Sequence, residues 1–166
     1  MKSPFLFLFG GKGMKTILVA GGAGYIGSHM VALLKEKGYN VIVVDNFITG
    51  HYNAIKGADK IYSGDLADKK FLNNIFLDNK IDGVINFAAY ALVGESMKEP
   101  FKYYQNNIMS AVSLLDIMHK HGVKYIVFSS TCAVYGNVES LISENTETNP
   151  INPYGDSKLS VERILK

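Results

Sequence analysis

The stretch VAGGAGYIGSH (residues 19–29) places Gly21, Gly24 and Gly27 at a three-residue spacing. An apolar run at 15–20 precedes these glycines and predicts a buried strand, while apolar residues at helical spacing over 25–38 predict a helix. A glycine-rich turn between a strand and a helix is typical of dinucleotide binding. The first glycine then allows the tight turn, the second lets the backbone approach a pyrophosphate at the helix N-terminus, and the third lets the helix lie close to the strand. An ordinary glycine-rich turn is the alternative interpretation.

Strand and helix patterns alternate through the rest of the chain. Further strands are predicted at 40–46, 60–65, 82–89 and 124–130, and further helices at 69–79, at 95–122 and from Tyr154 onward. The polar residues 136–153 predict a surface loop. Apolar strands separated by helices favour an α/β fold with a doubly wound parallel sheet, covered by helices on both faces.

Composition narrows the possible partners. The formal net charge of +2 is spread over 166 residues with no Lys/Arg run, so we expect neither nucleic acid nor a membrane surface as partner. The single cysteine, Cys132, excludes an internal disulfide and suits a reducing compartment, so we expect a cytoplasmic protein. The four histidines show no metal-ligand spacing, and no metal is expected.

The first residues differ in character from the rest. Lys2 and the apolar FLFLF that follows resemble a secretory signal, but the run is short and no small-residue cleavage site follows it. We therefore interpret residues 1–13 as an extension outside the fold, with Met14 as the natural start. No apolar run reaches the ~20 residues that a membrane-spanning helix needs.

Asp45 closes the second predicted strand, 18 residues after Gly27. An acid at this position can accept hydrogen bonds from the adenosine ribose hydroxyls, and it would repel a 2′-phosphate. The residues that follow contain no Arg to bind such a phosphate, so NAD is favoured over NADP. Asp45 could also be a turn residue at the strand end.

Tyr154 and Lys158 lie four residues apart at the start of the last predicted helix, so their side chains share one face. The ordinary tyrosine pKa of about 10 is too high for a base at neutral pH. A nearby ammonium and an oxidised nicotinamide would lower that pKa, which makes Tyr154 a candidate base. Tyr52 and Lys56 have the same spacing, but they follow the second strand, where the ribose end of a dinucleotide belongs, and we interpret them as a solvated pair.

Hydroxyl side chains follow the fifth predicted strand, in SSTCAVYG (129–136). In an open α/β sheet, ligands bind outside the carboxyl ends of the strands. A hydroxyl here could therefore bond a substrate hydroxyl beside Tyr154. Thr131 is the candidate by position, and Ser129 and Ser130 are its competitors.

Several segments together resemble the extended short-chain dehydrogenase/reductase family: GGAGYIGSH, VVDN, GDL, NFAA, VGESM, YYQNN, FSSTCAVYG and NPYGDSK. Their order and spacing match over residues 14–166. The resemblance implies tightly held NAD and reversible oxidation at C4 of a UDP-hexose. Tyr154 would take the proton of the 4-hydroxyl, Thr131 would help to align that hydroxyl, and Lys158 would bond the nicotinamide ribose.

The resemblance also implies a set of cofactor-binding residues drawn from all these segments. They are Gly21, Gly24, Tyr25, Ile26, Gly27, Asp45, Asn46, Asp65, Leu66, Phe87, Ala88, Ala89, Asn106, Ser129, Tyr154 and Lys158. Ala91 departs from the pattern, because some members carry a Lys there that touches the cofactor phosphates.

The family contains several reactions, and the sequence separates some of them. Dehydratases carry an Asp-Glu pair directly after the Ser or Thr, whereas this chain has Cys132 and Ala133, so dehydration is disfavoured. Decarboxylases and the 4-epimerases of uronates or N-acetylhexosamines stay open, as does a non-catalytic dinucleotide-binding module.

Family members are about twice as long as this chain. The resemblance therefore implies a Rossmann domain at 14–166 that is truncated before the last strands and before the C-terminal domain that binds most of the UDP-hexose. A homodimer is expected for the full-length parent, and the fragment alone is expected to be inactive.

Overall fold

The computed structural model describes residues 15–139 and 141–166. The predicted extension at 1–13 and the predicted start at Met14 lie outside the described residues. The chain forms two compact units, one built from residues up to 88 together with 113–129, the other from 89–112 together with 130–166.

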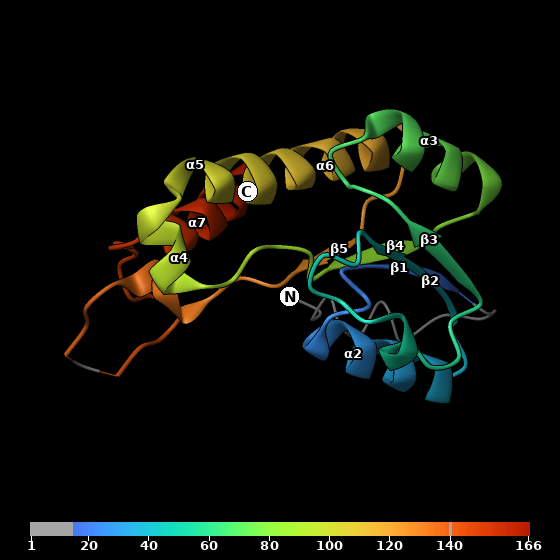
Figure 1. The fold of residues 1–166 in the computed structure, drawn as a ribbon, viewed down its shortest axis with the longest axis horizontal. Helices are drawn as coiled ribbons and strands as arrows, with labels where there is room; N and C mark the ends of the chain where they lie inside the picture. The colour runs from blue at the N-terminus through green and yellow to red at the C-terminus, as the bar shows by residue number, and fades with distance from the viewer. Residues whose placement is uncertain (1–14, 140) are drawn as a thin grey trace. The chain divides into compact units, whose positions relative to one another are not determined.

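The first unit contains a five-stranded parallel sheet (Figure 1). Its strands are β1 (Thr16–Ala20), β2 (Asn40–Asp45), β3 (Lys60–Ser63), β4 (Gly83–Asn86) and β5 (Ile126–Phe128), and their order is β3-β2-β1-β4-β5. The predicted doubly wound parallel sheet is confirmed. The strand predicted at 82–89 ends early, because the Asn86 side chain accepts a hydrogen bond from the Ala88 N–H (3.0 Å) and turns the chain.

Alternate residues of the central strands point to opposite faces, and each face has its own core. One face packs against α2 (Tyr25–Glu36), with Ile17, Val19, Val31, Leu34, Val41 and Val43 in its core. The other packs against α3 (Lys69–Asp78) and α6 (Ser110–Lys120), with Leu18, Ala20, Ile42, Val44, Leu72, Ile75, Leu114 and Ile117 in its core. Because both faces are buried, the strands read as continuous apolar runs.

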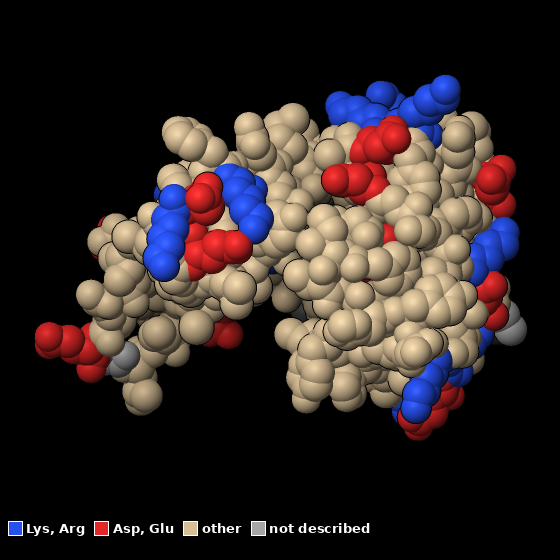
Figure 2. Space-filling model, in the orientation of Figure 1, with Lys and Arg blue, Asp and Glu red and all other residues tan. Residues whose placement is uncertain are grey.

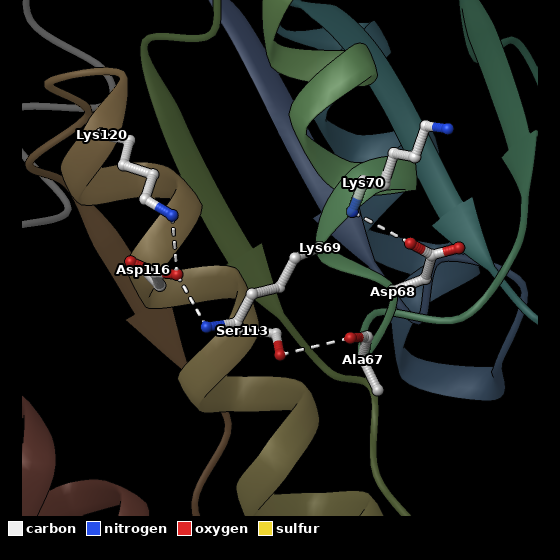
Figure 3. Close-up of polar contacts among 7 residues, drawn as sticks. All are labelled: Ala67, Asp68, Lys69, Lys70, Ser113, Asp116 and Lys120. Carbon is white, nitrogen blue, oxygen red and sulfur yellow. Dashed lines mark hydrogen bonds and ion pairs between the residues drawn. The ribbon is translucent and has the colours of Figure 1, made fainter.

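Polar contacts fasten α6 to the start of α3 (Figure 3). Asp68 caps α3 by accepting from the Lys70 N–H (2.9 Å). The Asp116 carboxylate pairs with Lys69 (2.7 Å) and with Lys120 (3.1 Å). The buried Ser113 hydroxyl donates to the Ala67 carbonyl (3.4 Å), so the loop after β3 is tied to α6.

The second unit is built mainly from helices. They are α4 (Val93–Lys98), α5 (Pro100–Tyr103), the π-helix η2 (Tyr104–Met109), the first residues of α6, the 3₁₀ helix η3 (Cys132–Tyr135) and α7 (Pro153–Leu165). The helix predicted over 95–122 is interrupted at Glu99, whereas α5, η2 and α6 follow one another without a break from Pro100 to Lys120. Glu99 leaves the helical region (φ −123°, ψ 58°), because Pro100 restricts the residue before it and starts a new helix.

Charged side chains of both signs lie close together in small groups on the face shown in Figure 2. Among the described residues, no helix has both the length and the apolar character needed to cross a membrane.

Candidate cofactor and catalytic site

Two of the predicted glycines occupy positions that no larger residue fits. Gly21 follows β1 with φ +73°, and its N–H donates to the Val44 carbonyl (2.8 Å). A Cβ on Gly21 would lie 2.6 Å from the backbone nitrogen of Ala88, and a Cβ on Gly27 would lie 2.1 Å from the Gly21 oxygen. The turn is therefore closed tightly against the end of β4 and against the first turn of α2.

Gly24 differs, because the protein leaves space around it. A Cβ on Gly24 would meet only the Gly21 oxygen, at 3.5 Å, which is an ordinary contact. Gly24 is the N-cap of α2, and in the described residues no side chain caps this helix and no acid lies in its first turn. The apolar side chains of Tyr25 and Ile26 beside it are 83% and 59% exposed. A helix start with open space above it suits an anionic group such as a pyrophosphate.

The Asp45 carboxylate binds the glycine turn directly. Its Oδ2 accepts from the Ala23 N–H (2.9 Å) and its Oδ1 from the Phe47 N–H (2.9 Å). The Asn46 side chain accepts from the Ile48 N–H (3.1 Å). The turn role considered for Asp45 is thus present. A carboxylate has about four acceptor positions, so capacity remains for hydroxyl groups of a ligand.

The other predicted cofactor residues of the first unit lie after strand ends. Exposed Asp65 accepts from the Ala67 N–H (2.8 Å), whereas Leu66 is buried in the core. Phe87 and Ala88 follow β4, and the Ser129 N–H after β5 donates to the Asn86 carbonyl (3.0 Å). The strand order reverses direction at β1, which is the point where doubly wound folds bind ligands.

Tyr154 and Lys158 lie one turn apart at the start of α7 in the second unit. The Asn152 side chain caps this helix by accepting from the Gly155 N–H (2.8 Å), and Pro153 begins it. Tyr154 is partly buried, while Lys158 is 3% exposed. Burial lowers the pKa of Lys158 from the ordinary 10.5 to about 8, because the charged form loses water.

The segment carrying Thr131 packs against the same helix. Thr131 caps η3, and its hydroxyl oxygen accepts from the Ala133 N–H (3.2 Å). A Cβ on Gly155 would lie 2.5 Å from the Ala133 oxygen, so η3 and α7 are in direct contact. The competitor Ser130 donates its hydroxyl proton to Glu162, whereas Thr131 uses its oxygen as an acceptor and keeps a proton to donate. Of these two hydroxyls, Thr131 is the better donor to a ligand.

Tyrosine rings and asparagine side chains surround the start of α7. The fully buried Tyr103 meets Tyr154 edge to face, with ring centroids 6.4 Å apart. The pKa of Tyr103 is raised to about 12, mainly because the ring is buried and secondly because its hydroxyl donates a hydrogen bond to Glu95. Asn106 in η2 donates to the Asn107 side chain (3.0 Å), and Ala89 begins the segment that leads to α4.

The second Tyr/Lys pair lacks this setting. Tyr52 lies in η1 (Tyr52–Ala54), which ends before Lys56, and Tyr52 is 64% exposed. The two residues therefore do not share a helical face, in agreement with their interpretation as a solvated pair.

Sequence reasoning missed several residues that shape the site. Gly22 lies against Val43, where a Cβ would come within 2.7 Å of Cγ1, and the Gly-Gly pair was the available signal. Gly155 directly follows Tyr154, and a glycine beside the candidate base was a local signal that another part of the chain comes close there. Asn107 and Ser157 had none, because their hydrogen bond joins residues 50 positions apart.

A parallel sheet with this strand order, a glycine turn after β1 and an acid at the end of β2 define a dinucleotide-binding protein of the doubly wound class. Residues 17–166 match the NAD dependent epimerase/dehydratase family, and the chain belongs to that family.

Relatives and solved structures agree with this assignment. The chain is 56% identical over 154 residues to the UDP-glucose 4-epimerase of Streptococcus mutans, covering 91% of this chain and 46% of the relative. The structure of UDP-glucose 4-epimerase from Brucella ovis in complex with NAD is similar with a TM-score of 0.88 and 43% identity, over 91% of this chain and 46% of that one. The structure of UDP-glucose 4-epimerase from Bifidobacterium longum in complex with NAD+ and UDP is similar with a TM-score of 0.87 and 44% identity, over 91% of this chain and 48% of that one. The chain thus spans about half the length of the relatives it matches.

Proposed function

We propose that this chain supplies the NAD-binding and catalytic residues of a UDP-glucose 4-epimerase, which interconverts UDP-glucose and UDP-galactose. The main support is the arrangement on α7, where Tyr154 lies one turn from the buried Lys158 and the Thr131 segment packs on the same helix. A module that only binds a dinucleotide has no use for these three side chains.

The glycine turn is proposed to hold the cofactor pyrophosphate. Gly24 leaves open space over the first turn of α2, whose unpaired N–H groups and dipole favour negative charge. Asp45 and Asn46 would bind the adenosine ribose, since Asp45 retains acceptor capacity beyond its two backbone bonds. NAD, when bound, supplies the acceptor and donor of hydride.

The other proposed cofactor contacts are those that the family resemblance implies. In the first unit they are Gly21, Tyr25, Ile26, Gly27, Asp65, Leu66, Phe87, Ala88 and Ser129, and in the second they are Ala89, Asn106, Tyr154 and Lys158. Phe87 and Ala88 follow the interior strand β4, so they lie at the carboxyl edge of the sheet where such ligands bind.

Tyr154 is proposed to move the substrate proton. Its phenolate oxygen would take the proton of the sugar 4-hydroxyl, and the phenol so formed would return it once the 4-keto sugar has turned over. Lys158 stays mostly protonated at neutral pH with a pKa of about 8, and its positive charge would stabilise the phenolate form of Tyr154. Thr131 would donate to the sugar oxygen and orient it, because its hydroxyl proton is not used in η3.

Substrate, assembly and location complete the proposal. A UDP-hexose is the proposed substrate, with most of its contacts supplied by sequence outside this chain, and a homodimer is proposed for the full-length protein. We place it in the cytoplasm, in keeping with the exposed free thiol of Cys132.

The test uses the purified full-length protein. Mass spectrometry after denaturation is expected to release about one NAD per chain, and a coupled assay is expected to show conversion of UDP-galactose to UDP-glucose. Stoichiometric NAD without turnover of UDP-galactose would instead identify a different reaction or a binding module.

A further inference from the structure

A buried tyrosine in the second unit contacts both the proposed base and the segment that follows Ala89. Tyr103, in α5, is fully buried, and its ring meets that of Tyr154 edge to face, with centroids 6.4 Å apart. Its hydroxyl accepts from the Leu92 N–H (3.1 Å) and donates to Glu95 Oε2 (2.7 Å). One side chain therefore joins the start of α7 to the backbone that leads from Ala89 into α4.

The Glu95 carboxylate, in the first turn of α4, fixes the hydroxyl end of Tyr103. Its other oxygen, Oε1, pairs with Lys102 (2.6 Å), the residue before Tyr103 in α5. The Lys102 ammonium also lies over the ring of Tyr90, 4.6 Å from the ring centroid. Hydrogen bonds from Lys102 and, secondly, from Tyr103 hold the pKa of Glu95 below its ordinary value, so the carboxylate stays an acceptor at neutral pH.

The two phenols that meet here have different chemical capacities. The pKa of Tyr103 is raised to about 12, so its hydroxyl keeps its proton at neutral pH and donates it to Glu95. Its one accepted and one donated hydrogen bond leave no proton for a ligand. Tyr103 is therefore unsuited to act as a second base beside Tyr154, and its contribution comes from where its ring is held.

We propose that Tyr103 is a positioning residue: anchored through its hydroxyl to Glu95, its ring fixes the place of the Tyr154 ring in the site. This inference rests on the proposed function. Aromatic pairs in edge-to-face contact have preferred geometries, so a displaced Tyr103 ring displaces its neighbour. Proton transfer is sensitive to such displacements, since about 1 Å of misplacement can cost about 100-fold in rate.

Two substitutions in the full-length protein release the anchor from opposite ends. Tyr103→Phe keeps the ring and removes the hydroxyl, and Glu95→Ala removes the carboxylate. Each is expected to lower kcat about tenfold. We expect KM for UDP-galactose to stay within about twofold of the wild type and bound NAD to be retained, because neither side chain is proposed to touch the ligands.

A conservative variant tests whether the acceptor atom is what matters. Glu95→Gln keeps an oxygen that can accept from the Tyr103 hydroxyl, although it loses the charge that pairs with Lys102. It is expected to recover most of the kcat that Glu95→Ala loses. Unchanged kcat in Tyr103→Phe and Glu95→Ala, or a Glu95→Gln variant as slow as Glu95→Ala, would overturn the inference.

The pH dependence of kcat separates positioning from a general loss of structure. A Tyr154 ring displaced from Lys158 would lose part of the charge that stabilises its phenolate, so the pH of half-maximal kcat is expected to rise by about one unit in Tyr103→Phe. A merely structural defect would lower kcat by the same factor at every pH. A pH profile with the wild-type midpoint would therefore contradict the positioning role.

Two matched controls come from the first unit. Tyr62→Phe removes a hydroxyl that accepts from Asn79 (3.0 Å) in the edge strand β3. Asp116→Asn removes a carboxylate that pairs with two lysines, and its side chain is 29% exposed against 33% for Glu95. Both controls are expected to keep the kcat and the pH profile of the wild type.

A further readout needs no activity. Tyr154 is partly buried, so its nitration by tetranitromethane, followed by peptide mass spectrometry well below the unfolding temperature, reports the placement of its ring. Faster nitration of Tyr154 is expected in Tyr103→Phe and Glu95→Ala but not in the two controls, and wild-type rates in all four would contradict the inference. A wild-type protein without epimerase activity would refute only the proposed function, because nitration would still test the positioning role.

Discussion

Gly155 lies directly against the carbonyl of Ala133, so closely that a Cβ at position 155 would come within 2.5 Å of that oxygen. The contact joins the residue after Tyr154 to the 3₁₀ turn capped by Thr131. Two side chains with proposed roles on the same substrate hydroxyl are thereby held by one close backbone approach, which only glycine permits.

Gly155→Ala is therefore expected to separate η3 from α7. The clash is with backbone, which cannot move aside as the end of a flexible side chain can, so we expect a lower melting temperature and a large loss of kcat. Thermal unfolding and the UDP-galactose assay measure the two effects.

Gly94→Ala is the control for this substitution. Gly94 lies within α4, and a Cβ there would meet nothing within 4 Å. Alanine is favoured over glycine inside a helix by about 1 kcal/mol, so this variant should be as stable as the wild type or slightly more so. Equal melting temperatures for the variants at 155 and 94 would show that the contact with Ala133 does not matter.

The glycine turn allows binding and folding to be tested separately. Gly24→Ala adds a Cβ at an ordinary 3.5 Å from the nearest protein atom, so we expect near-normal stability but little retained NAD, because the methyl group occupies the proposed pyrophosphate space. Gly27→Ala places a Cβ 2.1 Å from the Gly21 oxygen, and both stability and NAD should be lost. Thermal unfolding and mass spectrometry of released NAD distinguish the two. Full NAD retention in Gly24→Ala would exclude the proposed pyrophosphate position.

The buried ammonium of Lys158 should make stability depend on pH. Its pKa is lowered from 10.5 to about 8, so between these values the unfolded chain binds more protons than the folded one, and the free energy of unfolding rises with pH. Below about pH 8 the full cost of the buried charge is present, which corresponds to roughly 3 kcal/mol. Lys158→Met removes the charge, and we expect a variant that is more stable at pH 7 and lacks this rise.

Urea denaturation at several values between pH 7 and 10 compares the two proteins. Tyr103, with its pKa raised from 10 to about 12, makes stability depend on pH mainly above this range, where the free energy of unfolding falls as pH rises. Parallel pH profiles for wild type and Lys158→Met would mean that Lys158 is not desolvated in the folded protein.

Tyr154→Phe removes the proposed proton-transfer group and leaves the ring in place. We expect NAD to be retained and kcat to fall by about 10²–10⁴, the usual contribution of a positioned acid or base. Tyr52→Phe is the matched control, because Tyr52 is 64% exposed in a short 3₁₀ helix, and its activity should be unchanged. Comparable turnover by Tyr154→Phe and the wild type would rule out Tyr154 as the base.

Much of the fold could be predicted from local patterns. The helix at 25–36 carries apolar residues at helical spacing, and the strands at 16–20 and 40–45 are short continuous apolar runs rich in β-branched residues, which is typical of buried strands. The break in the helix predicted over 95–122 also has a local cause, because Pro100 disfavours the helical conformation at Glu99, the residue before it.

The sequence by itself determined the class of the fold, the glycine turn and the pairing of Tyr154 with Lys158, because each depends on residues within one turn or one strand-to-helix connection. Only the tertiary structure decided that Lys158 is buried, that Gly155 lies on Ala133 and that Asn107 reaches Ser157. These features depend on which distant segments pack together, and a hydrogen bond between residues 50 positions apart leaves no periodic trace in the chain.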